Sequence, residues 1–520
     1  MSKLLSAAQM RAIEQAAIRA GDVTGLELME RAGQGVVDAI FAQWPDLGKT
    51  SYRAVVLCGP GNNGGDGFVV ARLLKTWGWT VDVYLLGAAD RLPPDARVNH
   101  DRWVRDGRCE PLSKCQIASL TPRPDLVIDA LFGTGLSRGI EGDAARLIGE
   151  LKVPRWDFGV KIVAVDIPSG ICADSGRPLG PFAPADLTVT FHSEKLGHHL
   201  AAAGGHCACV VVSDIGLSHD GQSPEPGLVR KVRAPEAGLL GKAGMAHKYD
   251  CGHALVLSGG FARTGAARLA ARGALRVGAG LVTLGVPPNA QMEVASQITA
   301  LMLVRIADDE ALAKVLQDDR INALCLGPGL GLEKGEGTRA LVERAVRPPG
   351  APRGVVLDAD ALTAFAGDPG QLFDMLHGHC ILTPHGGEFA RLFPDIAKRL
   401  CQEPKSGPAY SRVDATRAAA RRAGCVILLK GPDTVIAGPD GQCAVHSAQY
   451  ERSAPWLATA GSGDVLAGLI TGLLARGFAP IQAAETAAWL HVQCALSYGP
   501  GLIAEDIAEE LPRVLRAPDL

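Results

Sequence analysis

Short apolar runs alternate with helical patterns along the chain, and this alternation occurs twice. In the first half the apolar runs are AVVLC (54–58), VDVYLLG (81–87), LVIDALFG (126–133), KIVAVDIPSG (161–170) and LTVTFHS (187–193). In the second half they are HALVLSGG (253–260), GLVTLGVP (280–287), ALCLGPGLG (323–331), VVLDADAL (355–362), CILTPH (380–385) and CVILLKG (425–431). Continuous apolar strands separated by helices are typical of parallel sheets covered on both faces. The pattern predicts two α/β domains, with helices that include 68–78 and 463–477.

The alternation lapses between the two halves. Residues 218–244, SHDGQSPEPGLVRKVRAPEAGLLGKAG, are rich in Pro, Gly and charge. Such composition is typical of a linker between domains. We therefore place the domain boundary near residue 225, with one domain over 1–224 and the other over 225–520.

Composition narrows the classes of function. The chain has 520 residues, of which 47% are hydrophobic and 21% charged, so it can bury two cores. Its formal net charge of -3 and the lack of a long basic run argue against a nucleic-acid partner. No run of 18 apolar residues occurs and residues 6–18 carry charge, so we expect neither a membrane span nor a signal peptide, but a cytoplasmic protein. The thirteen cysteines form no CxxC pair and are expected to be reduced core thiols.

The first strand of the first domain is followed by the glycine-rich stretch GPGNNGGDG (59–67). Glycine permits close backbone approach, and the N-terminus of the next helix offers N–H groups to an anion. The stretch is thus a candidate phosphate cradle, although its spacing fits neither the dinucleotide fingerprint nor the P-loop. A plain tight turn is the alternative.

Polar residues follow three strands of this domain. They are Asn62, Asn63 and Asp66 after the first strand, Asp129 before FGTGLSRG, and Asp166 with Ser169 in DIPSG. Ligands of such sheets bind outside the carboxyl ends of the strands. Oxygen ligands without clustered His or Cys suit a hard cation such as potassium or magnesium and not zinc. Each carboxylate could instead satisfy its own turn.

The second domain contains TAGSGDVLAGLITGLLARG (459–477). Gly461, Ser462 and Gly463 would open a long helix, where their N–H groups could stabilise a phosphoryl group during transfer. Asp464 in the first turn could accept a proton from an attacking hydroxyl. The helix dipole alone also favours Asp at this position. Lys430 follows one strand, and His385 and Glu388 follow another.

Taken in order, these motifs resemble the bifunctional NAD(P)H-hydrate repair enzymes, in which an epimerase is fused to an ADP-dependent dehydratase. The resemblance covers both halves, through LMERAG, GPGNNGGDG, DALFGTG, DIPSG, GPGLG, LDADAL, LTPHGGEF, LKG, TAGSGDVLAG and GLIAEDI. It implies an α/β protein with an N-terminal Rossmann-like, three-layer epimerase domain and a ribokinase-like α/β dehydratase domain. The substrates would be NADHX and NADPHX, the hydrates of NADH and NADPH.

For the epimerase, the resemblance implies that Asp166 handles the proton as the C6 hydroxyl leaves the nicotinamide ring and returns on the other face. It places potassium on Asn63, Asp129 and Ser169. The residues it places against the substrate are Asn62, Asn63, Gly64, Gly65, Asp66, Gly133, Thr134, Gly135, Leu136, Ser137, Arg138, Gly139 and Asp166.

For the dehydratase, the resemblance implies that phosphoryl transfer from ADP converts the C6 hydroxyl of the S-hydrate into a good leaving group, giving NAD(P)H, AMP and phosphate. Asp464 would deprotonate that hydroxyl, and magnesium would accompany the nucleotide. The implied hydrate contacts are Ala266, Gly329, His385 and Asp464; the implied ADP contacts are Lys430, Gly431, Pro432, Asp433, Thr434 and Gly463.

Three positions depart from the family pattern. Gly386 stands where Pro or Ala is frequent, Val492 where Gly commonly follows the His, and Ser462 where Thr is common. None of these changes removes a polar group with an expected role. Two other classes remain as alternatives, a ribokinase-type small-molecule kinase for the second domain and a non-catalytic binding module for the first. Symmetric homo-oligomers are frequent among proteins of this kind, so a homo-oligomer is expected.

Overall fold

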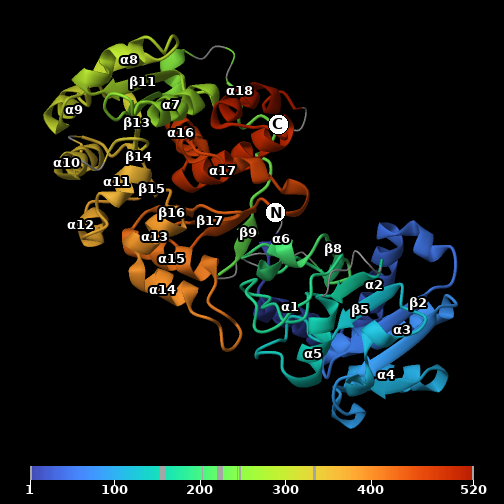
Figure 1. The fold of residues 1–520 in the computed structure, drawn as a ribbon. Coiled ribbons are helices and arrows are strands. Elements are labelled where there is room, and N and C mark those ends of the chain that lie inside the picture. The colour runs from blue at the N-terminus through green and yellow to red at the C-terminus, as the bar shows by residue number, and fades with distance from the viewer. Residues whose placement is uncertain are drawn as a thin grey trace. The chain divides into compact units, whose positions relative to one another are not determined.

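The computed structural model describes residues 3–152, 159–201, 203–218, 227–242, 244, 247–331, 335–348 and 350–517 (Figure 1). The chain forms two compact units, the first made of Met1–Val229 and Glu403–Ser411, and the second of Arg230–Gln402 and Arg412–Leu520. The boundary expected between residues 224 and 225 lies outside the described residues. The nine residues Glu403–Ser411 come from the second half of the sequence, and the composition of the chain gave no sign that they belong to unit 1.

Unit 1 is built on a parallel sheet in the order β4-β3-β2-β5-β6-β7-β8. Its strands are β2 (Arg53–Cys58), β3 (Thr80–Leu85), β4 (Cys109–Pro111), β5 (Leu126–Ala130), β6 (Lys161–Val165), β7 (Leu187–Phe191) and β8 (Val210–Ser213). Its helices are α1 (Ala7–Ala20), α2 (Gly25–Gln43), α3 (Asn62–Thr76), α4 (Pro94–Asp106), α5 (Gly142–Leu151) and α6 (Ala203–His206). The strand order reverses between β2 and β5, and ligands of open α/β sheets bind beside such a reversal.

Helices cover both faces of this sheet, which confirms the three-layer α/β fold. Val56 and Cys58 of β2 pack with apolar residues of α1, α2, α3 and α4 in one core cluster. Val55 and Leu57 of the same strand pack with α5 in another cluster. Successive side chains of a strand point to opposite faces, so the unbroken apolar run AVVLC supplies both cores.

The glycine-rich stretch is mostly helical, because α3 begins at Asn62 and not at the expected residue 68. A Cβ on Gly64 would lie 2.1 Å from the Gly59 carbonyl oxygen, and one on Gly67 would lie 2.8 Å from the Ala130 Cβ. A Cβ on Gly65 would meet Met29 Sδ at 2.5 Å. These three glycines therefore let α3 pack closely on the strand ends and on α2, and their N–H groups remain at the helix N-terminus.

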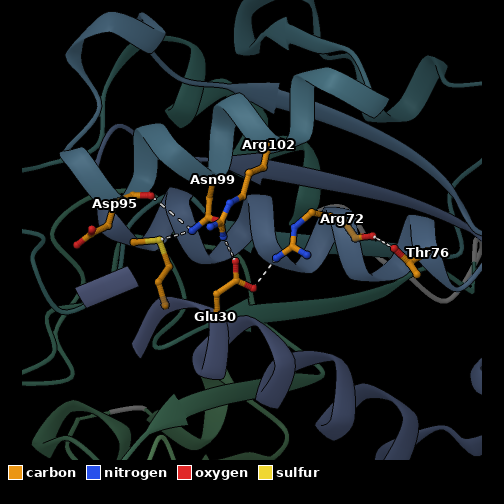
Figure 2. Close-up of polar contacts among 7 residues, drawn as sticks. Glu30, Arg72, Thr76, Asp95, Asn99 and Arg102 are labelled. Carbon is orange, nitrogen blue, oxygen red and sulfur yellow. Dashed lines mark hydrogen bonds and ion pairs between the residues drawn. The ribbon is translucent and has the colours of Figure 1, made fainter. Parts of the chain in front are cut away.

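A network of partly exposed charged side chains joins α3 to its neighbouring helices (Figure 2). The Glu30 carboxylate of α2 pairs with Arg72 of α3 and with Arg102 of α4. Asn99 of α4 adds hydrogen bonds to Met29 Sδ, at 3.2 Å, and to the Asp95 carbonyl. The three helices are thus tied together around α3, whose first turn carries the predicted site residues 62–66.

Unit 2 contains a larger sheet in the order β9-β18-β17-β16-β15-β14-β13-β10-β11-β12. Its strands are β9 (Val229–Lys231), β10 (His253–Leu257), β11 (Leu281–Val286), β12 (Met302–Arg305), β13 (Ile321–Leu326), β14 (Gly354–Leu357), β15 (Cys380–Leu382), β16 (Val426–Leu429), β17 (Asp433–Ala437) and β18 (Cys443–Ser447). The strands from β12 to β16 run parallel, whereas β17 is antiparallel to both β16 and β18. The order reverses between β10 and β13, which marks the expected ligand edge.

The helices of unit 2 surround one that is almost entirely buried. They are α7 (Gly265–Arg276), α8 (Gln291–Ala295), α9 (Asp309–Val315), α10 (Gly335–Val346), α11 (Ala359–Thr363), α12 (Pro369–Phe373), α13 (Gly386–Leu392), α14 (Pro394–Cys401), α15 (Arg412–Ala423), α16 (Ser462–Ala475), α17 (Pro480–Tyr498) and α18 (Ala504–Val514). Every residue of α16 from Val465 to Ala475 is buried, among α7, α17 and the sheet. The apolar pattern at 463–477 thus predicted a real helix, and the core holds its N-terminal turn in place.

All thirteen cysteines are free thiols, as expected. Cys401 is exposed, so the expectation that all of them lie in the core is wrong for this residue. Within the described part of the chain, no helix combines the length and the apolar character needed to cross a membrane.

Candidate active sites

Polar residues that end three neighbouring strands of unit 1 meet at one edge of the sheet. The carboxylate of Asp166, just after β6, accepts the Thr134 N–H at 2.9 Å. The Asn63 amide lies between the Val165 carbonyl and the Gly133 N–H, 3.3 Å from each, when its nitrogen faces the carbonyl. The first turn of α3 and the start of the 133–139 loop are therefore in contact around Asp166.

Asp129, at the end of β5, is paired with Ser169. The Ser169 hydroxyl donates to Asp129 Oδ1 at 2.6 Å, and the Ser169 N–H donates to Oδ2 at 2.9 Å. Burial raises the pKa of Asp129 above its usual value, although the hydrogen bonds from Ser169 and Leu131 act in the opposite direction. Burying a carboxylate is costly unless hydrogen bonds or a positive charge compensate for the lost water.

Asp166 is the most constrained residue of this edge. Its backbone has a φ of 70°, a left-handed conformation that is rare outside glycine and typical of functional positions. Thr190 donates to its carboxylate at 2.9 Å, and Lys195 Nζ lies 3.2 Å away. Burial alone would raise the pKa of Asp166, but the Lys195 charge, the Thr134 N–H and His198 outweigh it and lower the pKa. The carboxylate is thereby kept ionised.

Lys195 and His198 were not among the residues predicted from the sequence. The Lys195 side chain is 1% exposed and also donates to the Thr190 hydroxyl, at 2.7 Å. His198 Nδ1 accepts the Lys195 N–H, so its Nε2 carries the proton that faces the Asp166 carbonyl at 2.9 Å. Burial lowers the pKa of His198 to about 4. The signal in the sequence was a further polar stretch, SEKLGHH, after the strand 187–193.

Asp66 and Glu14 add two more carboxyl groups to the site. Burial raises the pKa of Asp66 well above its usual value, and the charges of Asp166 and Glu14 raise it further. Burial and Asp166 likewise raise the pKa of Glu14. Neighbouring carboxyl groups whose pKa values move in opposite directions are typical of acid–base sites. Asn62, in contrast, is exposed at the start of α3.

In unit 2, Asp464 stands in the first turn of α16 beside a buried ion pair. Lys430 Nζ donates to Asp358 Oδ1 at 2.7 Å, and Asp358 is 1% exposed. A Cβ on Gly463 would lie 3.5 Å from the same ammonium nitrogen. Burial raises the pKa of Asp464 to about 6, and the charge of Asp358 contributes to the rise while Lys430 opposes it. Such a pKa suits a general base near neutral pH.

The predicted hydrate contacts Ala266 and Gly329 are brought together at the sheet reversal. Gly329 follows β13 with a φ of 64°, and a Cβ there would lie 2.7 Å from the Arg263 carbonyl and 3.3 Å from the Ala266 Cβ. A Cβ on Gly259, after β10, would lie even closer, 1.9 Å from the Gly329 carbonyl oxygen. The backbone conformation and the close approach both require glycine at 329.

His385 caps the helix α13. Its Nδ1 accepts the Gly387 N–H at 2.9 Å, so Nε2 carries the proton and lies 3.4 Å from Glu388 Oε1. The His385 side chain is 54% exposed, whereas that of Glu388 is 6% exposed. The imidazole is thus held by a buried carboxylate while one edge remains open to a ligand.

The predicted ADP loop, 430–434, is held by its own hydrogen bonds and by Arg412. The Thr434 hydroxyl donates to the Gly431 carbonyl at 2.8 Å. Arg412 donates to the Lys430 carbonyl and lies 3.1 Å from the Asp433 carboxylate. The Asp433 side chain therefore braces the loop from inside. Arg412 and Asp358 were missed as functional residues, although Asp358 lies in the quoted motif LDADAL.

The Ser462 hydroxyl is engaged in a backbone hydrogen bond and not in the candidate site. The hydroxyl donates to the Leu457 carbonyl at 2.8 Å, and the Ser462 carbonyl faces His491 Nε2 at 2.9 Å. Either Ser or Thr could form this hydrogen bond. Among the residues that the structure describes, no group of three or more His, Cys, Asp and Glu side chains is arranged to hold a metal ion.

Comparison with known proteins places these features in context. Residues 25–197 match the family described as YjeF-related protein N-terminus, and residues 254–513 match NAD(P)H-hydrate dehydratase. The bifunctional NAD(P)H-hydrate repair enzyme Nnr of Salinibacter ruber is 35% identical over 98% of this chain and 96% of its own length. The NAD(P)H-hydrate epimerase of Rhodobacter capsulatus is 49% identical, over 42% of this chain and 100% of its own.

One similar protein has a solved structure with nucleotide. The ADP/ATP-dependent NAD(P)H-hydrate dehydratase from Bacillus subtilis, co-crystallised with ATP/Mg2+, is 29% identical. The alignment covers 52% of this chain and 92% of that one, with a TM-score of 0.44. The similarity to the Salinibacter ruber protein, in contrast, spans both units.

Proposed function

The chain belongs to the family of bifunctional NAD(P)H-hydrate repair enzymes, and we propose that Asp166 in unit 1 and Asp464 in unit 2 are the catalytic residues of its two reactions. It is an NAD(P)H-hydrate epimerase and a nucleotide-dependent NAD(P)H-hydrate dehydratase in one chain. One observation carries the assignment of residues. Each carboxylate lies beside a lysine at the strand-end edge of its own sheet, and the pKa of Asp166 is lowered while that of Asp464 is raised.

For the epimerase, the substrate would lie against residues 62–66, residues 133–139 and Asp166. When the C6 hydroxyl gains a proton and leaves as water, the ring becomes a cation that the ionised Asp166 stabilises. Water then adds to the other face of C6, and Asp166 accepts the proton it releases. Asp66 retains its proton to a higher pH than an ordinary carboxyl group and would supply the first proton.

A potassium ion would bind the oxygen atoms of Asn63, Asp129 and Ser169. The Asp129 carboxylate is buried and accepts hydrogen bonds from Ser169 and Leu131, and a monovalent cation would balance its charge. Asn63, whose amide oxygen faces the Gly133 N–H, would present a second oxygen to the same ion. When bound, potassium would supply electrostatic stabilisation, and the protein residues would hold the substrate loop around it.

For the dehydratase, Asp464 would accept the proton of the C6 hydroxyl as the oxygen attacks the β-phosphorus of ADP. That attack releases AMP and leaves a phosphate ester on C6. Phosphate is a far better leaving group than hydroxide, so it departs from C6, and loss of a proton from the neighbouring C5 completes NAD(P)H. The N–H groups of 461–463 would stabilise the transferring phosphoryl group, and Lys430 would neutralise part of its charge. Ala266, Gly329 and His385 would contact the hydrate.

Residues 430–434 with Gly463 would hold ADP, and Mg2+ would accompany the nucleotide. The buried carboxylate Asp358, beside Lys430 and near Asp464, is an oxygen ligand of the kind that Mg2+ prefers. When bound, the ion would offset phosphate charge. Family membership sets aside the kinase and the binding-module alternatives, while the cytoplasmic location and a homo-oligomeric state stay predictions.

Two variants of the full chain test the assignment. Asp166→Asn should abolish interconversion of R- and S-NADHX and leave dehydration of S-NADHX with ADP unchanged. Asp464→Asn should do the reverse. Epimerisation is followed by chromatographic separation of the two hydrates, and dehydration by absorbance at 340 nm. If Asp166→Asn interconverts the hydrates at the rate of the unmodified chain, or Asp464→Asn still forms NADH, the corresponding assignment is wrong.

A further inference from the structure

The segment Glu403–Ser411 belongs to unit 1 although the helices on either side of it, α14 and α15, belong to unit 2. It makes specific backbone contacts in unit 1. The Gly407 N–H donates to the Ser137 carbonyl at 2.9 Å, and Ser406 pairs with Arg138 in an isolated antiparallel bridge. Arg177 donates to the Tyr410 carbonyl at 3.2 Å. The segment is therefore joined to the 133–139 loop like a short added strand.

Apolar contacts fix the same segment from a second side. Ala409 is 5% exposed and packs with Cys172 and Leu179, and Leu136 of the substrate loop lies against this group. The Ala409 N–H faces Cys172 Sγ at 3.4 Å. A Cβ on Gly407 would lie 2.9 Å from the Leu136 carbonyl oxygen and 3.3 Å from Leu179 Cδ1. The fit at Gly407 leaves no room for a larger residue without a shift of the loop.

The loop that the segment holds leads directly to the candidate catalytic carboxylate. Thr134, three residues before Ser137, donates its N–H to Asp166 at 2.9 Å, and Gly133 next to it faces both Asp166 and Asn63. A shift of residues 136–138 would be transmitted along this short glycine-rich stretch. A small displacement of the residues that position a substrate lowers both substrate affinity and reaction rate, even when the cause lies far from the reacting atoms.

We propose that Gly407 and Ala409, in the segment Glu403–Ser411, are positioning residues of the epimerase that hold the substrate loop 133–139 around Asp166. This inference rests on the proposed roles of Asp166 and of that loop. The Asp166 carboxylate is held by Thr134, Thr190 and Lys195, all of which lie outside the segment. Loss of the segment's contacts should therefore weaken substrate binding more than it slows the chemical step.

The test uses full-chain variants and R-NADHX. Gly407→Val pushes against the Leu136 carbonyl, Ala409→Glu places a charge in the apolar group, and Lys405→Ala, at an exposed position of the same segment, is the matched control. Epimerisation is coupled to NADH formation at 340 nm by an excess of the Asp166→Asn chain with ADP. The same variants are assayed directly on S-NADHX for dehydration.

We expect Gly407→Val and Ala409→Glu to raise the epimerase KM for R-NADHX about tenfold, with kcat changed less than about twofold. Lys405→Ala and all dehydration rates should match the unmodified chain. Unchanged KM values in both variants overturn the inference. If Gly407→Val fails to fold, dehydration is lost as well. Gly407→Ala then tests the inference, because its single methyl group meets the same Leu136 carbonyl oxygen. Epimerisation retained by Asp166→Asn would instead refute the proposed site.

Discussion

The pH dependence of dehydration follows from the surroundings of Asp464. Burial, followed by the charge of Asp358, raises the pKa of Asp464 from 3.8 to about 6, against the effect of Lys430. The rise corresponds to about 3 kcal/mol against the charged form at most, and to less where solvent screens the group. A base must be ionised to act, so about one-tenth of the enzyme is competent at pH 5 and about nine-tenths at pH 7. We expect kcat/KM for S-NADHX to rise about tenfold between these pH values.

The assay is the initial rate at 340 nm with S-NADHX and saturating ADP, measured from pH 5 to pH 8. The terminal phosphate of ADP also titrates near neutral pH, so a variant must separate the two groups. Asp358→Asn removes a charge that raises the pKa of Asp464 and keeps Lys430, so the midpoint should move down by about one pH unit. A profile that is flat from pH 5 to pH 8, or a midpoint unmoved in Asp358→Asn, would refute the role of Asp464 as the base.

Three further predictions concern stability and the epimerase. Because the folded-state pKa of Asp464 is raised, its proton stabilises the fold fully below pH 3.8, and this stabilisation is lost as the pH rises past about 6. Asp464→Asn should therefore raise the melting temperature at pH 8 and leave it unchanged at pH 3.5. Lys195→Met removes the charge that lowers the pKa of Asp166, so the epimerase rate at pH 7 should fall at least about tenfold and recover partly at higher pH. Gly64→Ala places a methyl 2.1 Å from the Gly59 carbonyl and should destabilise unit 1 by about 2 kcal/mol or more in urea unfolding, whereas Gly61→Ala, with open space around it, should cost much less.

Much of the fold could be predicted from the sequence because its signals are local. Unbroken apolar runs such as AVVLC mark strands buried on both faces, and the run at 463–477 marks a helix buried all round. The start of α3 was placed six residues too late, because glycines are poor helix formers in isolation. Here tertiary packing overrides that preference, since Gly64, Gly65 and Gly67 are needed where the helix touches the strand ends.

Candidate site residues were predictable where they stand in a motif at the end of a strand, as Asp129, Asp166 and Lys430 do, or in the first turn of an apolar helix, as Asp464 does. Side chains that support them from other parts of the chain carried no such signal. Lys195 reaches Asp166 from beyond the next strand, and Arg412 braces the 430–434 loop from the start of α15. Both contacts depend on which segments the fold places side by side.

The placement of Glu403–Ser411 shows the same limit at the level of domains. A cut by sequence position assigns these residues to the second half, because they lie between two of its helices. Their contacts with Ser137, Cys172 and Leu179 place them in unit 1 instead. A polar, proline-containing loop could pack in many places. Its position is decided by the surface of unit 1 that it fits, which the local sequence does not reveal.

The central claim is that one chain carries both an epimerase and a dehydratase. The most direct test is absorbance at 340 nm with a mixture of R- and S-NADHX, incubated with the protein and ADP, with ATP, or with no nucleotide. We expect full recovery of NADH with ADP, because the epimerase converts the R-hydrate into the S-hydrate that the dehydratase consumes. We expect no recovery without nucleotide, because the dehydratase needs a phosphoryl donor. Recovery that stops when the S-hydrate is consumed would contradict the epimerase assignment, and no recovery with either nucleotide would contradict the dehydratase.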